Sequence, residues 1–130
     1  MIKPHLKPKK TKPIGYYQKK ADRLLQELGR QTYDRCLVCG GEYCCLHHFV
    51  YKSQSTALRY DWENAIPLCV SCHYKIHAGK NDTIPGEITL IKGQDWINNL
   101  KERRKEGAGN YFGKGWYKEK IEYLEQMLDK

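Results

Sequence analysis

The sequence predicts an α+β fold in which a small core of two strands and one helix is flanked by longer helices. Two stretches rich in β-favouring residues, 43–51 and 64–68, predict the strands. Apolar residues recurring at helical spacing predict flanking helices on both sides of these stretches. The 130-residue chain has the length of one domain, and it contains only two Phe and two Met. We therefore expect a small apolar core that needs further stabilisation.

The chain begins with a basic segment, residues 1–13, that we expect to be disordered. Lysines alternate here with three prolines, so the segment has little to bury and cannot sustain a helix. Lys9, Lys10 and Lys12 suit sequence-independent contact with phosphates, and a solubilising tail is the alternative. We expect residues 14–130 to form a single domain.

The charge balance favours polyanionic partners. Lys and Arg number 23 against 15 Asp and Glu, which gives a net charge of +8. A soluble basic protein without such a partner is the alternative. The chain has no apolar run of the length of a signal peptide core or a transmembrane helix. We expect a cytoplasmic protein with no membrane contact and with its six cysteines reduced.

The first helix is predicted from Tyr16 to about Arg30. Starting at Ala21, apolar residues fall at positions i, i+3, i+4 and i+7, which is the pattern of one buried helix face. Gly29 follows this pattern and is predicted to cap the helix at its carboxyl end. We expect the helix to pack against the core.

Two Cys-x-x-Cys pairs predict one structural zinc ion bound by four thiolates. The pairs are Cys36 with Cys39 and Cys69 with Cys72. In a reducing compartment, two such pairs are typical of a closed tetrahedral zinc site, and the two glycines after the first pair can supply a positive φ. Neither pair has the βαβ context of a redox motif. The long separation between the pairs indicates that another element is inserted between them.

The strand predicted at 43–51 carries His47 and His48 in its middle. Neighbouring side chains on a regular strand point to opposite faces. Either the strand is distorted here, or only one of the two histidines directly faces the site. Cys44 and Cys45 are expected to be small buried apolar residues, and the alternative is that one of them replaces an assigned zinc ligand.

A polar connection, residues 52–63, joins the two predicted strands. Lys52 and Arg59 in this loop could contact phosphates, although a solvated loop is the alternative. After the second cysteine pair, a helix from about His73 to Ala78 would place His73 and His77 on one face, one turn apart, and Gly79 would end it.

The carboxyl-terminal part is predicted to contain a short strand at 87–91 and two helices, at 94–106 and 116–128, separated by a glycine-containing loop. Basic residues at 101–105 are interspersed with glutamates. A solvated helix face and a DNA contact explain that pattern equally well.

The order of a strand with two histidines, a loop, an asparagine and a helix with His-x-x-x-His, framed by the cysteine pairs, resembles the HNH endonucleases and their ββα-metal fold. This resemblance covers residues 36–79. Within that group, His48 to Ser53, Ala57 to Asp61, Asn64 and Cys69 to His73 look like the NinG (Rap) type of phage recombination nuclease. The resemblance implies a metal-dependent DNA endonuclease with a zinc-stapled HNH core.

Carried over by position, the resemblance assigns roles to five residues. His48 matches the general base, His47 the metal-ligand position before it, and His73 with His77 the helical metal ligands. Asn64 matches the central asparagine, which in the family either orients the base or binds the metal; here we expect orientation. Many family members have Asp at the position of His47. The cofactor implied is one divalent metal, Mg²⁺, Mn²⁺, Ni²⁺ or Zn²⁺, and the nitrogen-rich donor set disfavours Mg²⁺.

The narrower resemblance implies branched or junction DNA as the partner, and a homodimer if both strands are cut. The competing class is a zinc-stabilised nucleic-acid-binding module without cleavage activity. Such a module has no need of His48, Asn64 and His77 in addition to four cysteines.

Overall fold

The computed structural model describes residues 12–78 and 83–130, so most of the predicted basic arm, with Lys9 and Lys10, and Gly79 lie outside the described residues. The predicted α+β fold is confirmed. Its elements are α1 (Ile14–Thr32), β1 (Cys45–His48), the single 3₁₀ turn η1 (Trp62–Asn64), β2 (Ala65–Leu68), α2 (Val70–His77), α3 (Thr83–Lys92), α4 (Gln94–Gly107) and α5 (Lys114–Leu128).

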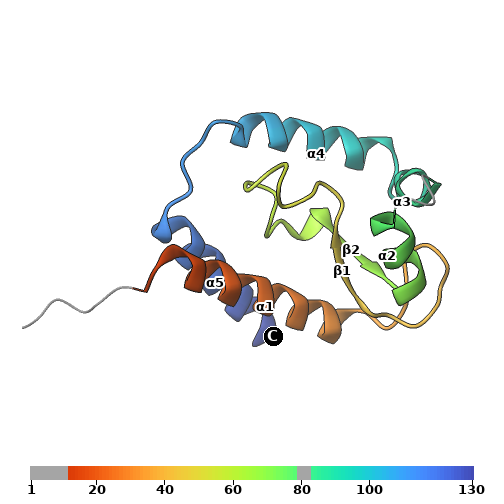
Figure 1. Ribbon diagram of the computed structural model, residues 1–130, viewed down its shortest axis with the longest axis horizontal. Coiled ribbons are helices and arrows are strands. Elements are labelled where there is room, and N and C mark those ends of the chain that lie inside the picture. Colours follow the sequence, from red (N-terminus) through yellow and green to blue (C-terminus); the bar gives the residue numbers. More distant parts are fainter. Residues whose placement is uncertain (1–11, 79–82) are drawn as a thin grey trace, which may run out of the picture.

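The helices surround the strands on three sides. α1 and α5 lie side by side along one edge of the molecule, and α4 runs along the opposite edge (Figure 1). The two strands and α2 lie between these edges, and α3 packs against both α2 and α4 (Figure 1). No helix of the described ranges is long and apolar enough to cross a bilayer.

The sheet consists of β1 and β2, paired antiparallel from Cys45 opposite Leu68 to His48 opposite Ala65. β1 is shorter than the predicted strand at 43–51. The ladder ends because the backbone N–H of Val50 donates to the Asn64 side-chain oxygen, at 2.7 Å, instead of to a backbone carbonyl. The chain then turns away into the 52–63 loop.

This loop is not the solvated connection that its composition suggests. Leu58 and Tyr60 are almost fully buried, at 1% and 2% exposure. Tyr60 packs with α1 and α5, and its hydroxyl donates to the Gln18 carbonyl of α1 at 3.1 Å. The loop is therefore attached to the α1–α5 layer by its apolar residues.

Helix α2 begins three residues earlier than predicted. Its amino-terminal cap is Cys69, whose Sγ accepts a hydrogen bond from the Cys72 N–H at 3.3 Å. Side-chain acceptors at this position satisfy free N–H groups of the first turn. The second cysteine pair is thus the first turn of the helix that carries His73 and His77.

Gly29 does not cap α1, which continues to Thr32. A Cβ on Gly29 would lie 2.6 Å from Leu46 Cγ and would also meet the Tyr43 hydroxyl. Glycine is required here because it allows β1 to approach the helix closely. The position expected to end the helix is instead one at which α1 and the sheet lie close together.

The predicted strand at 87–91 is wrong, since these residues belong to helix α3. Ile84 and Ile88 are buried four residues apart, as on one face of a helix, whereas Leu90 is 84% exposed. The predicted helices at 94–106 and 116–128 are present as α4 and α5. The β-favouring composition of 87–91 is overridden by the spacing of the two buried isoleucines.

The apolar core forms two clusters that meet at the strands. The first joins α1 and α5 with Leu46, Tyr60 and Ala65. The second surrounds the cysteines with β2 and α3, and consists of Cys36, Ile66, Leu68, Cys69, Cys72, Ile84 and Ile88.

Candidate metal centres and active-site cavity

The four predicted cysteines lie together. Their Sγ atoms are all within 4.8 Å of one another, and Cys39 Sγ is 3.5 Å from Cys69 Sγ. Two thiolates on one tetrahedral zinc, each bound at about 2.3 Å, are about 3.8 Å apart. The cluster therefore fits a structural zinc site formed by Cys36, Cys39, Cys69 and Cys72.

Backbone N–H groups donate to two sulfurs of this cluster. The Cys72 N–H donates to Cys69 Sγ and, as the main cause, lowers the pKa of that thiol to about 7. The Gly41 N–H donates to Cys39 Sγ at 3.4 Å, from a turn in which Gly40 has a φ of 72°. Burial, by contrast, raises the pKa of the Cys72 thiol. The thiolate form that zinc binds is therefore favoured at Cys69 in particular.

Cys44 and Cys45 stand outside the four-cysteine cluster. The expectation that they are buried is wrong, because Cys44 is exposed and Cys45 is half-buried. The two thiols interact with each other, and burial, followed by the proximity of Cys44, raises the pKa of Cys45 to about 11. Neither replaces an assigned ligand.

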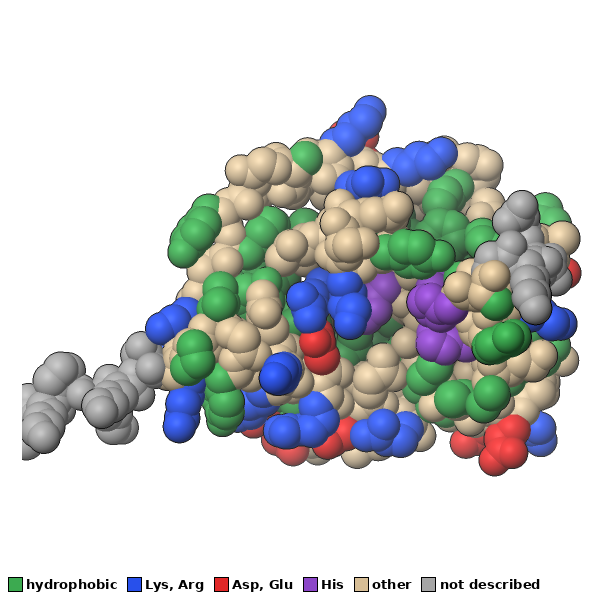
Figure 2. All heavy atoms as spheres, viewed as in Figure 1, with side chains coloured by type: hydrophobic (Ala, Val, Ile, Leu, Met, Phe, Trp, Pro, Cys, Tyr) green, Lys and Arg blue, Asp and Glu red, His purple; other side chains and the backbone are tan. Residues whose placement is uncertain are grey.

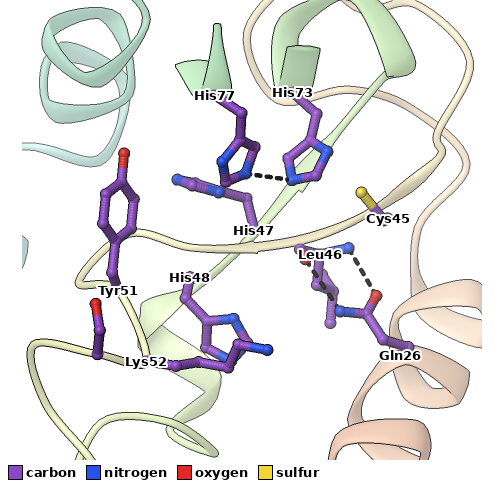
Figure 3. A pocket seen from close by; sticks show the side chains of 10 residues that line it. Gln26, Cys45, Leu46, His47, His48, Tyr51, Lys52, His73 and His77 are labelled. Atoms are coloured by element: carbon purple, nitrogen blue, oxygen red, sulfur yellow. Dashed lines mark hydrogen bonds between the residues drawn. The ribbon is translucent and has the colours of Figure 1, made fainter. Parts of the chain in front are cut away.

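Three histidines form a second cluster. His47 of β1 meets His73 and His77 of α2, and one nitrogen of each ring lies within 4.8 Å of the others. His73 Nε2 and His77 Nε2 are 2.9 Å apart. The three rings converge from the two elements toward one point (Figure 3).

The surroundings of this cluster suit a divalent metal. Burial, followed by the proximity of His73 and His77, lowers the pKa of His47 to about 3, and burial likewise lowers the pKa of His73. These imidazoles are consequently neutral at pH 7 and can offer lone pairs to a cation. Three nitrogens without a carboxylate favour Mn, Co, Ni or Zn over Mg, and three ligands leave positions open.

His48 lies on the other side of β1 from His47 (Figure 3). The strand is regular here, since the register continues through His48 opposite Ala65, so only His47 joins the metal cluster. His48 Nε2 is 2.8 Å from the Arg59 carbonyl oxygen. A carbonyl can only accept, so Nε2 carries the proton and Nδ1 keeps a free lone pair.

Burial lowers the pKa of His48, and the hydrogen bond to the Arg59 carbonyl partly opposes this effect. The ring is therefore neutral at pH 7. In this state Nδ1 can accept a proton, while the bond at Nε2 stabilises the imidazolium that forms.

The side chain of Asn64 makes its hydrogen bonds to the loop and not to His48. Its side chain is fully buried, and its oxygen accepts from the Val50 N–H. Its Nδ2 donates to the carbonyls of Val50, at 3.0 Å, and Leu58, at 3.1 Å. The expectation that Asn64 orients the base stays a prediction, and such an effect would pass through the loop, because the bonds of this side chain go to Val50 and Leu58. Asn64 instead holds together the two ends of the loop that follows β1.

One cavity of about 610 Å³ brings the histidines together. Its walls include His47, His48, His73 and His77, with Lys52 from the loop and Gln26 from α1. On this face the histidines reach the surface, and Lys and Arg side chains gather on the side of α1 (Figure 2). The cavity is open to a ligand and is bordered by positive charge.

Gln26 was not marked by any sequence motif. Its Nε2 donates to the Leu46 carbonyl at 3.1 Å, and its Oε1 accepts from the Leu46 N–H at 3.0 Å. The two bonds join α1 to β1 at the residue before His47. Only the position of Gln26 beside the apolar face of a predicted helix could have suggested this role.

The basic residues expected to contact DNA lie in different surroundings. Lys52 is exposed at the cavity wall, and Lys12 is exposed with its Nζ 5.8 Å from the centre of the Tyr16 ring. Arg59 is bound to Asp22 of α1, and its side chain is only 18% exposed. This geometry favours an internal role for Arg59 over the predicted phosphate contact.

Comparison with known families agrees with the two metal clusters. Residues 36–79 match the model of the HNH endonuclease family. The matched region begins at Cys36, includes both strands and ends after His77. No curated protein and no solved structure gave a significant match. The match and the clusters indicate a metal-binding domain with nuclease or nucleic-acid-binding activity.

Proposed function

We propose that this chain is a metal-dependent DNA endonuclease that hydrolyses phosphodiester bonds, with His48 as its general base. One observation carries the proposal. A histidine with a free Nδ1 and a hydrogen-bonded Nε2 shares a cavity with three convergent imidazoles. Phosphodiester hydrolysis requires a base for water and positive charge at the phosphate oxygens, and the two groups supply these requirements.

Each residue has a defined task in this proposal. His47, His73 and His77 would hold one divalent cation, which when bound supplies Lewis-acid stabilisation of the phosphate oxygens and the leaving alkoxide. His48 accepts the proton of the attacking water at Nδ1. The Arg59 carbonyl keeps the other ring nitrogen protonated and fixes the plane of the imidazole.

Other residues bind and position. Lys52, exposed at the cavity wall, would contact a non-bridging phosphate oxygen. Asn64 keeps the 50–58 loop closed and thereby acts on His48 indirectly, since the Leu58 carbonyl that it binds precedes Arg59. The four-cysteine site would hold a structural zinc that fixes the first turn of α2.

The competing function is a zinc-stabilised nucleic-acid-binding module. It would need the four-cysteine cluster and a basic surface. It would give no reason for a second, separate group of imidazoles in an open cavity. We therefore favour the nuclease.

The substrate we propose is branched DNA, such as junctions or flaps, cut with little sequence preference. The resemblance to the NinG type supports this substrate. A site that engages one phosphate reads few base edges, so selectivity must come from shape recognition by flanking segments. Because one site makes one nick, cutting both strands would require a homodimer.

The decisive experiment is nicking of supercoiled plasmid by zinc-loaded protein, dialysed free of other metals and then supplied with Mg²⁺, Mn²⁺, Co²⁺, Ni²⁺ or Zn²⁺. We expect nicking that depends on the added ion and is strongest with an ion that accepts nitrogen ligands. Binding of DNA without nicking under every condition would favour the binding module. Parallel cleavage of a four-way junction and of linear duplexes with the same arm sequences tests the substrate.

A further inference from the structure

The loop that holds His48 is attached to a helix outside the HNH-matched region. Asp22 lies on α1, 37 positions before Arg59, and the two side chains form a bidentate ion pair. Arg59 Nε donates to Asp22 Oδ1 at 2.9 Å, and Nη2 donates to Oδ2 at 2.6 Å. Paired bonds of this kind fix direction as well as distance.

The same arginine holds His48 through its backbone. The Arg59 carbonyl is the partner of His48 Nε2, at 2.8 Å. The side chain of Arg59 is thus held by Asp22, and the main-chain carbonyl of Arg59 holds His48, the proposed base. The pair is only partly exposed, at 18% for Arg59 and 28% for Asp22, so it is better shielded from solvent than a fully exposed pair.

Neighbouring contacts restrict the loop on both sides of Arg59. The preceding Leu58 carbonyl accepts from Asn64, and the following Tyr60 is buried against α1 and α5. These contacts restrain the backbone of Leu58 and Tyr60, the two neighbours of Arg59. The ion pair with Asp22, in contrast, restrains Arg59 directly.

We propose that Asp22 is a positioning residue for His48. Through its ion pair with Arg59 it holds the Arg59 carbonyl in the place where that carbonyl keeps His48 protonated at Nε2 and leaves Nδ1 free. The proposal rests on the nuclease function proposed above, and it extends the functional unit to α1, beyond residues 36–79. Arg59 then serves the site from inside the protein and not as a phosphate contact.

A purely stabilising ion pair is the alternative, and the chain contains a matched control. Arg103 of α4 binds Asp61 of the same loop at 2.5 Å, with exposures of 33% and 18%. This pair also ties the loop to a helix, but neither partner contacts His48. Arg103→Gln therefore measures the cost of losing a loop anchor that involves neither Arg59 nor a hydrogen bond to the proposed base.

The test compares Asp22→Asn, Arg59→Lys and Arg103→Gln in the full, zinc-loaded chain. Single-turnover cleavage gives the rate constant, and fluorescence anisotropy gives DNA affinity. We expect Asp22→Asn to lower the rate constant about 10- to 100-fold with little change in affinity, as seen when positioning partners of reactive groups are lost. Arg59→Lys, which keeps the charge and loses the paired bonds, should do the same, whereas Arg103→Gln should cleave within about 2-fold of the parent chain. Asp22→Glu, which keeps the carboxylate, should recover part of the rate.

A second measurement does not depend on cleavage. In ¹⁵N-histidine NMR, with His48 assigned through His48→Gln, the parent chain and Arg103→Gln should show His48 as the Nε2–H tautomer. Asp22→Asn should show a mixture of tautomers. If Asp22→Asn cleaves like Arg103→Gln and keeps the single tautomer, the inference is overturned while the nuclease function stands. If the parent chain does not cleave, the nuclease function fails, and the NMR comparison alone decides whether Asp22 fixes His48.

Discussion

His73 Nε2 and His77 Nε2 lie 2.9 Å apart on successive turns of α2. Two imidazoles at this separation can share a proton or bind one cation, and two nitrogens on one tetrahedral metal are about 3.3 Å apart. With His47 completing the group, the separation defines a site for a single ion.

Removal of one of these imidazoles should abolish metal binding at the cavity and leave the zinc. We expect His77→Ala to weaken binding of Mn²⁺ or Ni²⁺ by more than about 100-fold. Loss of a group that only hydrogen-bonds to a metal ligand weakens binding by about 10- to 100-fold, and loss of a ligand itself should cost more. Calorimetric titration of the zinc-loaded protein measures the affinity. Tyr74→Ala is the control, since Tyr74 is on the same helix and 63% exposed. Equal affinity in the two variants would exclude His77 as a ligand.

Substitutions of the two neighbouring histidines of β1 should affect catalysis and metal binding separately. His48→Ala should cleave about 10²- to 10⁴-fold more slowly, the usual contribution of a general base, with DNA and metal affinity unchanged. His47→Ala should lose the metal instead. Single-turnover cleavage with calorimetry distinguishes the two effects. Active His48→Ala beside a metal-binding but inactive His47→Ala would mean that the two roles are exchanged.

The four-cysteine site should contribute to folding itself. Zinc binding in small domains contributes about 10–16 kcal/mol, which is comparable to a domain's whole stability of about 5–15 kcal/mol. We expect Cys69→Ser to lose stoichiometric zinc and most of its cooperative thermal transition. Serine still caps helices, so loss of the cap does not explain such a result. Cys44→Ser, an exposed cysteine outside the cluster, should keep both zinc and Tm. A stable, zinc-free Cys69→Ser protein would contradict the prediction.

Replacing a helical glycine by alanine should change the free energy of unfolding in opposite directions at Gly29 and Gly86. Helical Gly→Ala changes usually stabilise by about 0.5–1 kcal/mol. Gly29→Ala should instead destabilise by about 1–3 kcal/mol, because its Cβ would meet Leu46 Cγ at 2.6 Å. Gly86→Ala in α3 should stabilise, since a Cβ there meets nothing within 4 Å. Urea unfolding gives both values, and stabilisation by Gly29→Ala would show that β1 can move away from α1.

The amino-terminal lysines should supply affinity that depends on salt. Residues 1–11 contain four lysines, and each phosphate contact adds about 0.9 to the slope of log K against log salt, so their removal should flatten the slope by up to about 3.6. The truncated chain lacks residues 1–11 and begins at Lys12. It keeps Pro13, whose carbonyl accepts a hydrogen bond from the Tyr16 N–H at the start of α1. Anisotropy titrations at several salt concentrations measure the slope. An unchanged slope would make the segment a solubilising tail.

Both metal clusters were predicted from local spacing and the family resemblance, whereas several contacts between distant residues were not. Both clusters could be found because Cys-x-x-Cys and His-x-x-x-His place their side chains within one turn. The strand pattern alone left open which of His47 and His48 faces the metal site. The family resemblance assigned His47, and the register of β1 with β2 agrees with that assignment. The pairing of Asp22 with Arg59 and the clamp from Gln26 to Leu46 join α1 to the later loop and strand, and no local pattern marks them.

Cys69 connects the cysteine cluster to the helix that carries two of the clustered histidines. Its sulfur is one of the four clustered thiols and also the cap of α2, and the same helix presents His73 and His77. Occupation of the cysteine site would order the first turn of the helix that carries both imidazoles, so it should preorganise the histidine site. Linkage is reciprocal, and each ion should raise the affinity of the other by the same factor. Zinc availability would then set the affinity for the second ion, so that the chain becomes competent for hydrolysis only after its structural site is filled.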